Sequence, residues 1–222
     1  MNIAGNILKH YLRNAYFLTG TAYAGKSTAA KLLAERYGMT LCGENYFSRV
    51  SDVIADPALQ PNLCYIPRLT NWEDFVRRSP EEYERWMYDT SREAAGFEVA
   101  ELIGLCWENK VIVDTNIPLD ILREISDYGH VAVMLSPQSL SVDRFFDRAD
   151  PEKRFLLSVI EGCEDAEAVM ANYRAGLERI NSQAHYDEYA HSGFFTLVRV
   201  DDGRDTRDEV CALLAEHFGL TA

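Results

Sequence analysis

The chain has 222 residues, of which 47% are hydrophobic and 26% charged, and its formal net charge is −13. These values fit one folded domain, or one domain with a small insertion. Because so acidic a surface repels nucleic-acid phosphates, the composition argues against a polynucleotide substrate, while a few arginines in a cleft could still bind a small anion.

The same composition bears on the compartment. Five scattered cysteines form no C-x-x-C pair, which indicates reduced thiols rather than a disulfide framework or a zinc site. No apolar run reaches membrane length, and the N-terminus lacks the apolar core of a secretion signal. We therefore expect a cytoplasmic protein with no membrane partner.

The first 42 residues alternate between helical and strand patterns. Residues 6–13 predict a short amphipathic helix, and the apolar run 15–19 predicts a buried strand that ends at Gly20. A helix at 26–37, stopped by Gly38, leads into a short strand at 39–42.

The next segment, 45–71, contains three prolines and predicts a loop with at most short helices. Ser79-Pro80-Glu81-Glu82 then combines a serine N-cap, a proline at the first helical position and a glutamate at the third. This pattern predicts a helix, or a pair of helices, that reaches Glu108. Residues 111–114 predict a buried strand that ends on a carboxylate.

The remaining pattern again alternates strands with helices. We expect a helix between Pro118 and Gly129, a strand at 131–135, helices from 140 to 189 with a break at 149–151, and a strand at 194–200. Thr206 and Glu209 predict a second capping box, which opens a final helix that Gly219 ends. This alternation predicts a single α/β domain over residues 1–222, with a parallel sheet covered on both faces.

The segment G-T-A-Y-A-G-K-S matches the phosphate-binding pattern G-x-x-x-x-G-K-[ST] and lies between a predicted strand and a predicted helix. The glycines allow successive N–H groups to point at phosphate oxygens, and the new helix directs its positive end at the same anion. Lys26 is expected to reach the β- and γ-phosphates, and Ser27 to ligate Mg²⁺. We expect the nucleotide to contact Gly20, Thr21, Ala22, Tyr23, Ala24, Gly25, Lys26, Ser27 and Thr28.

A GTPase would need an N-K-x-D segment after a later strand, whereas residues 131–135 are followed by S-P-Q-S, so ATP is the expected nucleotide. Three further segments resemble the nucleoside monophosphate kinase-like family of small P-loop kinases, which also contains shikimate- and gluconate-kinase relatives. V-I-V-D at 111–114, with T-N-I-P after it, is similar to the L-L-D-G-F-P segment of adenylate kinases. D-R-F-F-D-R at 143–148 is similar to the D-R-x-x-x-R that opens their lid, and R-V-D-D-G at 199–203 to the loop that lies by the adenine.

The resemblance follows the family's order over nearly the whole chain and implies its fold. That fold is a three-layer P-loop NTPase with a five-stranded parallel sheet in the order 2-3-1-4-5. A helical acceptor-binding insertion would span roughly 45–108 and a lid roughly 137–163. The resemblance also makes Arg144 a candidate to stack near the adenine, Arg148 a candidate to clamp phosphates, and Asp202 with Gly203 part of the adenine loop.

Two carboxylates follow predicted strands, at the edge where a parallel sheet places its ligand cleft. Asp114 is expected near Mg²⁺ together with Ser27, the alternative being a helix N-cap or a turn carboxylate. Glu44 is the candidate general base for a hydroxyl acceptor, the alternative being a solvated turn residue. For Arg144 and Arg148 the alternative is a solvated helix face paired with neighbouring acids.

The chain also departs from the family pattern. Tyr23 stands where these kinases usually have a third glycine, and Leu119 stands where adenylate kinases have an arginine that grips the acceptor's phosphate. These departures point away from an ordinary nucleotide acceptor. We expect one or two arginines of the insertion to hold an anionic group of the acceptor, from the set Arg49, Arg68, Arg77, Arg78, Arg85 and Arg92.

The function expected is ATP- and Mg²⁺-dependent phosphoryl transfer to a small hydroxyl compound or a nucleoside monophosphate. The alternatives are a P-loop ATPase without a small-molecule acceptor, and a non-catalytic nucleotide-binding module. The acceptor's identity and the oligomeric state are not readable from the residues.

Overall fold

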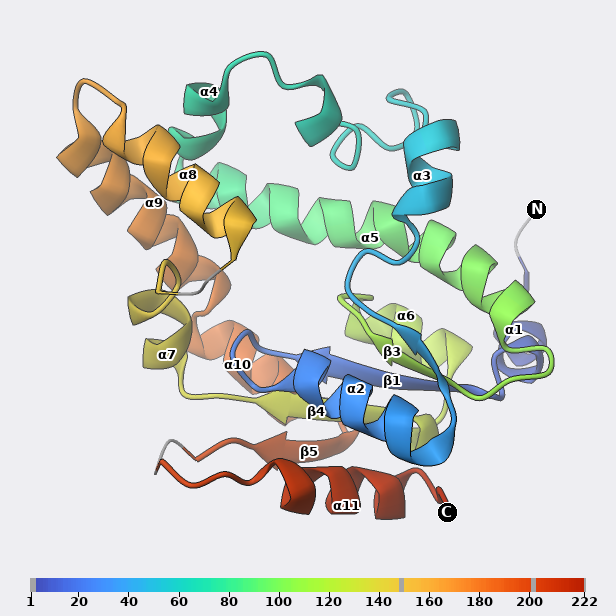
Figure 1. Cartoon of the computed structure of the whole chain (residues 1–222). Coiled ribbons are helices and arrows are strands. Elements are labelled where there is room, and N and C mark those ends of the chain that lie inside the picture. The colour runs from blue at the N-terminus through green and yellow to red at the C-terminus, as the bar shows by residue number, and fades with distance from the viewer. Residues whose placement is uncertain (1–2, 148–149, 201–202, 222) are drawn as a thin grey trace.

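The computed structural model describes residues 3–147, 150–200 and 203–221. A central sheet carries helices on both faces, and a group of helices stands above one of its edges (Figure 1). Two predicted site residues, Arg148 and Asp202, lie outside the described residues. Within the described ranges, no helix combines the length and the apolar character needed to span a membrane.

The sheet has five parallel strands in the order β2-β3-β1-β4-β5, which confirms the predicted order. The strands are β1 (Ala15–Gly20), β2 (Thr40–Cys42), β3 (Val111–Asp114), β4 (Val131–Leu135) and β5 (Phe195–Val198). In register, Phe17 of β1 lies beside Val113 of β3 and Val131 of β4. Because the strands are parallel, their carboxyl ends and the loops that follow meet at one edge of the sheet.

Alternate residues of the strands face two separate apolar clusters, as a sheet covered on both faces requires. Leu18, Ile112 and Ala132 face α2 (Lys26–Tyr37) and α11 (Arg207–His217). On the other face, Phe17, Val113 and Val133 pack with the second half of the long helix α5 (Pro80–Leu105) and with shorter helices. Those shorter helices are α1 (Gly5–Tyr11), α6 (Leu119–Ile125) and α10 (Gln183–Ala190), and the 3₁₀ turn η2 (Tyr128–His130) precedes β4.

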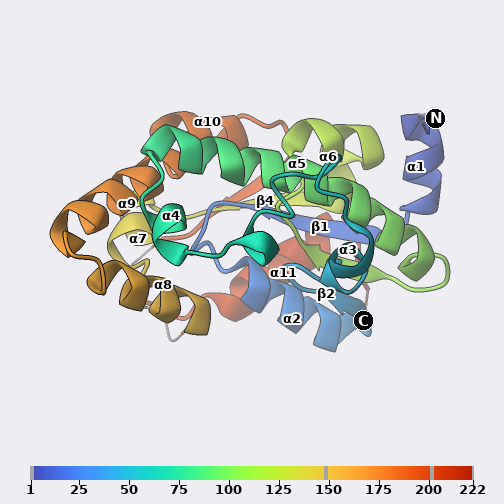
Figure 2. The same cartoon turned by 90° about the horizontal axis from the view of Figure 1, so that it is seen from above.

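Figure 2 views the helices above the sheet edge from above. Several of these helices share a third apolar cluster. Phe75 and Tyr83 from the predicted insertion belong to the same cluster as Ile160 from the lid and Tyr173 from the helix after it, and the Tyr83 and Tyr173 rings meet at 5.4 Å between centroids. The predicted insertion and lid are therefore joined by one core, and we call this unit the helical cap. The cluster draws residues from η1 (Ile66–Arg68), α4 (Trp72–Val76), α5 (Pro80–Leu105), α8 (Pro151–Glu161) and α9 (Ala166–Ile180). We also include in the cap α3 (Ser48–Ile54), which packs on α5, and α7 (Gln138–Asp143), which packs on α9.

Of the two capping boxes predicted from the sequence, one is confirmed and one is wrong. The Ser79 box forms: Glu82 N donates to Ser79 Oγ at 3.2 Å, and Ser79 N donates to Glu82 Oε2 at 2.9 Å. The box predicted at Thr206 is wrong, because Thr206 has φ −104° and ψ 11° instead of the extended backbone of an N-cap, and its side chain makes no cap bond. α4 is a further helix that the sequence did not predict.

Candidate functional site

The loop between β1 and α2 lies at the carboxyl edge of the sheet. Gly20 has φ +122°, and a Cβ there would come within 2.1 Å of the Met134 carbonyl oxygen, so the position admits only glycine. Gly25 has φ +91° and directly precedes the first residue of α2, Lys26. Both motif glycines therefore occupy positions that need them, and together they bring the N-terminus of α2 to this edge.

Tyr23 adopts a left-handed backbone at φ +64°, at the motif position where the sequence analysis expected a glycine. This conformation costs a non-glycine residue about 1 kcal/mol. Two contacts hold it: the Tyr23 hydroxyl donates to the Arg144 carbonyl at the end of α7, and Arg199 Nη1 donates to the Tyr23 carbonyl at 2.7 Å. The loop is thus tied both to the cap and to the residue that follows β5.

Ser136, the buried residue after β4, braces the other side of the loop. Its N–H donates to Thr21 Oγ1 at 2.8 Å, and its hydroxyl donates to the Ala22 carbonyl at 2.6 Å. Half-buried Lys26 folds back over the loop, where Nζ donates to the Gly20 and Thr21 carbonyls at 3.2 and 2.9 Å. The lysine ammonium and the loop backbone therefore share one small volume at the start of α2.

The two predicted metal ligands lie in direct contact. Ser27 Oγ donates to Asp114 Oδ2 at 2.5 Å, and Asp114 is only 5% exposed. Burial raises the pKa of Asp114, the nearby Lys26 charge and the Ser27 hydrogen bond oppose this, and the charge of Glu44 adds to it. A nearly buried carboxylate beside a hydroxyl is an oxygen pair of the kind that Mg²⁺ binds, so these residues fit that ion.

Glu44 lies in the same neighbourhood as Asp114. Asn116, in the turn after β3, donates through Nδ2 to Glu44 Oε1 at 3.3 Å, and both side chains are exposed. The structure therefore brings the predicted base to the predicted metal ligands. The sequence analysis did not single out Asn116, although its position two residues after Asp114 could have suggested it.

Glu98 is a buried carboxylate that the sequence analysis missed. It lies on α5, is 4% exposed, and its Oε2 accepts a hydrogen bond from Thr115 Oγ1 at 2.7 Å. Burial raises the pKa of Glu98 to about 7; the Thr115 bond opposes this rise, whereas the charges of Asp114 and Glu44 support it. The signal was present in the sequence, because Glu98 is an acid within the run A-A-G-F-E-V-A of a long helix.

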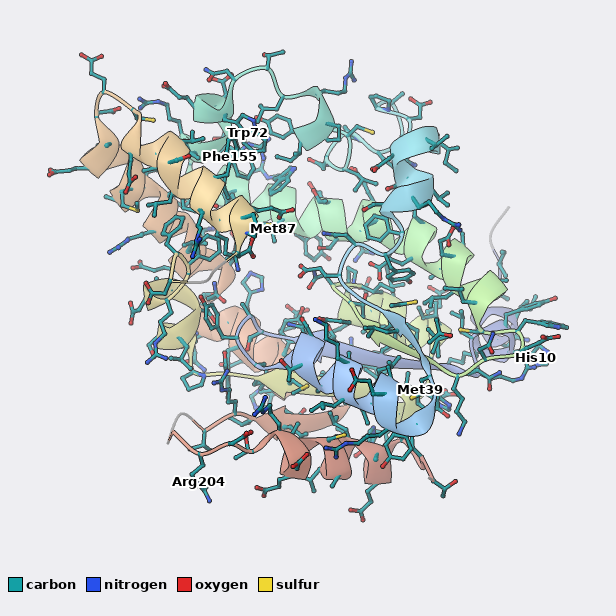
Figure 3. All side chains as sticks on the ribbon, viewed as in Figure 1. His10, Met39, Trp72, Met87, Phe155 and Arg204 are labelled. Carbon is teal, nitrogen blue, oxygen red and sulfur yellow. The ribbon has the colours of Figure 1, made fainter. Side chains whose placement is uncertain are left out.

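One cavity of about 1070 Å³ connects these groups with the helical cap. Its described walls include residues 20–28 of the loop, Glu44 and Asp114, and they continue along α5, α10 and the start of α8. Trp72 of α4 and Phe155 of α8 meet edge to face, 5.0 Å between ring centroids, in its upper wall (Figure 3). Met87, labelled in the same view, lines the cavity from α5.

Lys153, near the start of α8, brings a positive charge from the cap to this cavity. Its Nζ lies 4.9 Å from the Phe145 ring centroid and 6.0 Å from the Tyr23 ring centroid, which places the ammonium near the β1–α2 loop. The sequence analysis assigned the cap's phosphate contacts to arginines. Among the described cap residues, Lys153 is the permanent cation that lines the cavity.

The predicted arginines are placed elsewhere. Arg144 contributes its carbonyl to the Tyr23 contact, and neither Arg144 nor exposed Gly203 lines the cavity. None of the six insertion arginines lines it either. Three of them form ion pairs instead: Arg49 with Glu101, Arg77 with Asp165 and Arg92 with Asp120. The Arg78 guanidinium lies 3.8 Å from the Tyr65 ring centroid, and Arg78 and Arg85 line a separate pocket of about 350 Å³.

No protein-family model matches the sequence, and no curated protein matches it significantly. The candidate site accordingly rests on its own geometry.

Proposed function

We propose that the chain is a small P-loop kinase that transfers the γ-phosphoryl group of ATP to a small-molecule acceptor. One observation carries the proposal: the β1–α2 loop, the Ser27–Asp114 pair and Glu44 open into one cavity that extends far beyond the loop. A triphosphate tail on the loop would leave the remaining space, under the cap, for a second substrate. The sheet order is consistent with a P-loop fold.

The loop residues would bind and orient the phosphates. The main-chain amides at the start of α2 and the Lys26 ammonium face the same small volume, so both can stabilise negative charge on the transferring group. Lys153 would contact the phosphates from the cap side and help to exclude water. Ser27 and Asp114 would hold Mg²⁺, which when bound would supply positive charge that offsets the negative charge of the phosphates.

Glu44 would act as the general base for a hydroxyl acceptor. The acceptor oxygen attacks the γ-phosphorus, the bond between that phosphorus and the β–γ bridging oxygen breaks, and ADP leaves. The proton released by the hydroxyl passes to the Glu44 carboxylate, which the Asn116 amide orients. Asp114 is held by Ser27 and is therefore less available as the base.

Two measurements test the proposal. Calorimetry on the intact protein should detect binding of ATP with Mg²⁺, and ADP formation should stay slow until a suitable acceptor is added. Absence of nucleoside triphosphate binding would contradict the whole proposal. Rapid phosphate release with ATP alone would favour an ATPase, and binding without transfer to any acceptor would favour a non-catalytic module.

A further inference from the structure

Helices α5 and α10 contribute part of the cavity wall. We call this part of the cavity the acceptor pocket and define it by Glu84 and Tyr88 of α5 and by His185, Tyr186 and Glu188 of α10. Glu84 Oε1 lies 3.1 Å from His185 Nε2, so the two helices meet across this pocket. α10 covers the sheet face opposite α2, which places the pocket across the sheet edge from the start of α2.

The charges along the cavity are unevenly distributed. Among its described lining residues, the carboxylates are Glu44, Glu84, Asp114, Asp120, Glu152 and Glu188, whereas the permanent cations are Lys26 and Lys153. Both lysines lie at the loop: Lys26 bonds the loop carbonyls, and Lys153 lies beside the Tyr23 ring. The positive charge is therefore placed for a phosphate chain on the loop, and the acceptor pocket has carboxylates instead.

Two arginines lie behind these carboxylates and do not line the cavity. Arg179 Nε donates to Glu84 Oε2 at 2.6 Å, and Arg92 Nη1 donates to Asp120 Oδ1 and to the Tyr88 hydroxyl at 3.0 Å each. Burial opposes ionisation of Glu84, but the bonds from Arg179 and His185 outweigh it and lower its pKa. Glu84 therefore stays ionised, and its guanidinium partner fixes the carboxylate without offering a site to an anion.

Aromatic rings provide the rest of the wall. Tyr186 and Tyr88 belong to the acceptor pocket, and Trp86 and Tyr83 of α5 also line the cavity, 6.0 Å apart between ring centroids. Aromatic faces bind the apolar faces of ring compounds and attract cations. Ionised carboxylates accept hydrogen bonds from hydroxyl and ammonium groups and repel phosphate and carboxylate groups.

We propose that the phosphoryl acceptor is an alcohol without an anionic group, a ring compound whose hydroxyl or amino groups donate hydrogen bonds to Glu84 and Glu188. The inference rests on the proposed kinase function and names its substrate class. It excludes nucleoside monophosphates, sugar phosphates and sugar acids. It also requires a base for the hydroxyl proton, a role that Glu44 fills.

Matched pairs of acceptors test the charge preference. With ATP and Mg²⁺ present, ADP formation is measured with adenosine against AMP, cytidine against CMP, and glucose and glucosamine against glucose 6-phosphate and gluconate. We expect the neutral or aminated member to be the better acceptor by at least about tenfold in kcat/KM, since one close like-charge contact has that effect. The proposal fails if an anionic member is the better acceptor, or if no uncharged or aminated alcohol accelerates ADP formation by protein that binds ATP with Mg²⁺.

A pair of variants ties the preference to the pocket. Glu188→Gln should raise KM for an aminated alcohol about fivefold to tenfold and leave KM for ATP unchanged. Glu178→Gln is the matched control, because Glu178 is exposed on α9 and does not line the cavity. Equal KM values for the aminated acceptor in both variants would contradict the role of Glu188. If the unaltered protein does not bind ATP with Mg²⁺, the proposed kinase function itself is refuted.

Discussion

Glu98 on α5 accepts a 2.7 Å hydrogen bond from Thr115, the residue that follows Asp114. The same Thr115 hydroxyl accepts the Ile117 N–H at 2.9 Å, so the turn after β3 closes around this one oxygen. The turn carries Asp114 at its start and Asn116 at its centre. A helix of the cap therefore sets the position of the proposed metal ligand and of the residue that orients Glu44.

The first prediction concerns the pH dependence of stability. The pKa of Glu98 is raised to about 7 in the fold, so the native state holds this proton more tightly than the unfolded chain does. The resulting stabilisation is complete below the unfolded pKa and is lost as pH rises to 7, a loss of about 2–3 kcal/mol. Glu98→Gln keeps an acceptor for Thr115 and cannot ionise, so its free energy of unfolding should fall less between pH 5 and pH 8.

Urea denaturation at the two pH values measures this difference. Glu108→Gln, which changes an exposed carboxylate, is the control and should behave as the unaltered protein does. The same pH dependence in Glu98→Gln and in the control would refute the assignment.

The second prediction concerns Lys26. Lys26→Ala removes the ammonium that lies over the loop, so the Kd for ATP with Mg²⁺ should rise at least about tenfold and kcat/KM should fall about 100-fold or more. Lys31→Ala, at an exposed position further along α2, should change neither quantity. Calorimetry measures the Kd, and ADP formation measures kcat/KM. Unchanged affinity for ATP in Lys26→Ala would contradict the proposal that the loop binds the nucleotide.

The third prediction sets activity against stability at Asp114. Burial makes the charged form of this carboxylate costly and raises its pKa, so the neutral Asp114→Asn should increase the free energy of unfolding at pH 7 without nucleotide. The same change removes the proposed ligand of Mg²⁺, so kcat should fall and the Mg²⁺ concentration for half-maximal activity should rise. A variant that keeps the Mg²⁺ dependence of the unaltered protein would rule out the metal role.

The fourth prediction concerns Glu44. If Glu44 accepts the hydroxyl proton, Glu44→Gln should lower kcat about 100-fold or more and leave the Kd for ATP with Mg²⁺ unchanged. Glu35→Gln, on the exposed face of α2, is the control. If Glu44→Gln keeps the kcat of the unaltered protein, Glu44 is not the general base and is a solvated turn residue instead.

The fifth prediction uses the left-handed backbone of Tyr23. Glycine tolerates φ +64° and alanine does not, so Tyr23→Gly should be more stable than Tyr23→Ala by about 1 kcal/mol. At Ala24, which does not share this conformation, Ala24→Gly should instead destabilise the protein. Thermal unfolding of the three variants provides the comparison, and equal stability of the two Tyr23 variants would contradict the strained backbone.

Local patterns predicted much of the fold and of the loop. The strands at 15–20, 111–114 and 131–135 are apolar runs that end at a glycine or a polar turn, and the Ser79 box satisfies its own backbone donors. These features depend on neighbours within a few residues. The capping box predicted at Thr206 was wrong although its residue types fit the pattern. Thr206 does not have the extended backbone of an N-cap, and the residue types alone do not show this.

The parts that escaped prediction depend on contacts between distant segments. Glu98 meets Thr115 because α5 crosses over β3, and Lys153 lies near Tyr23 because α8 packs on α4 beside the loop. Local residue types likewise could not show that the insertion arginines point away from the cavity towards acidic partners such as Asp165. Only the packing of the cap determines which charges the cavity receives.

α5 runs without interruption through 26 residues, about 39 Å, from Pro80 to Leu105. One end carries Glu84 into the acceptor pocket, and the other is anchored through Leu102 in the core on the sheet face opposite α2. Glu98 lies between them, so one continuous helix joins the wall of the acceptor pocket to the turn after β3. Under the proposed function, the helix that presents Glu84 to the acceptor would also position Asp114, the proposed magnesium ligand, through Glu98 and Thr115.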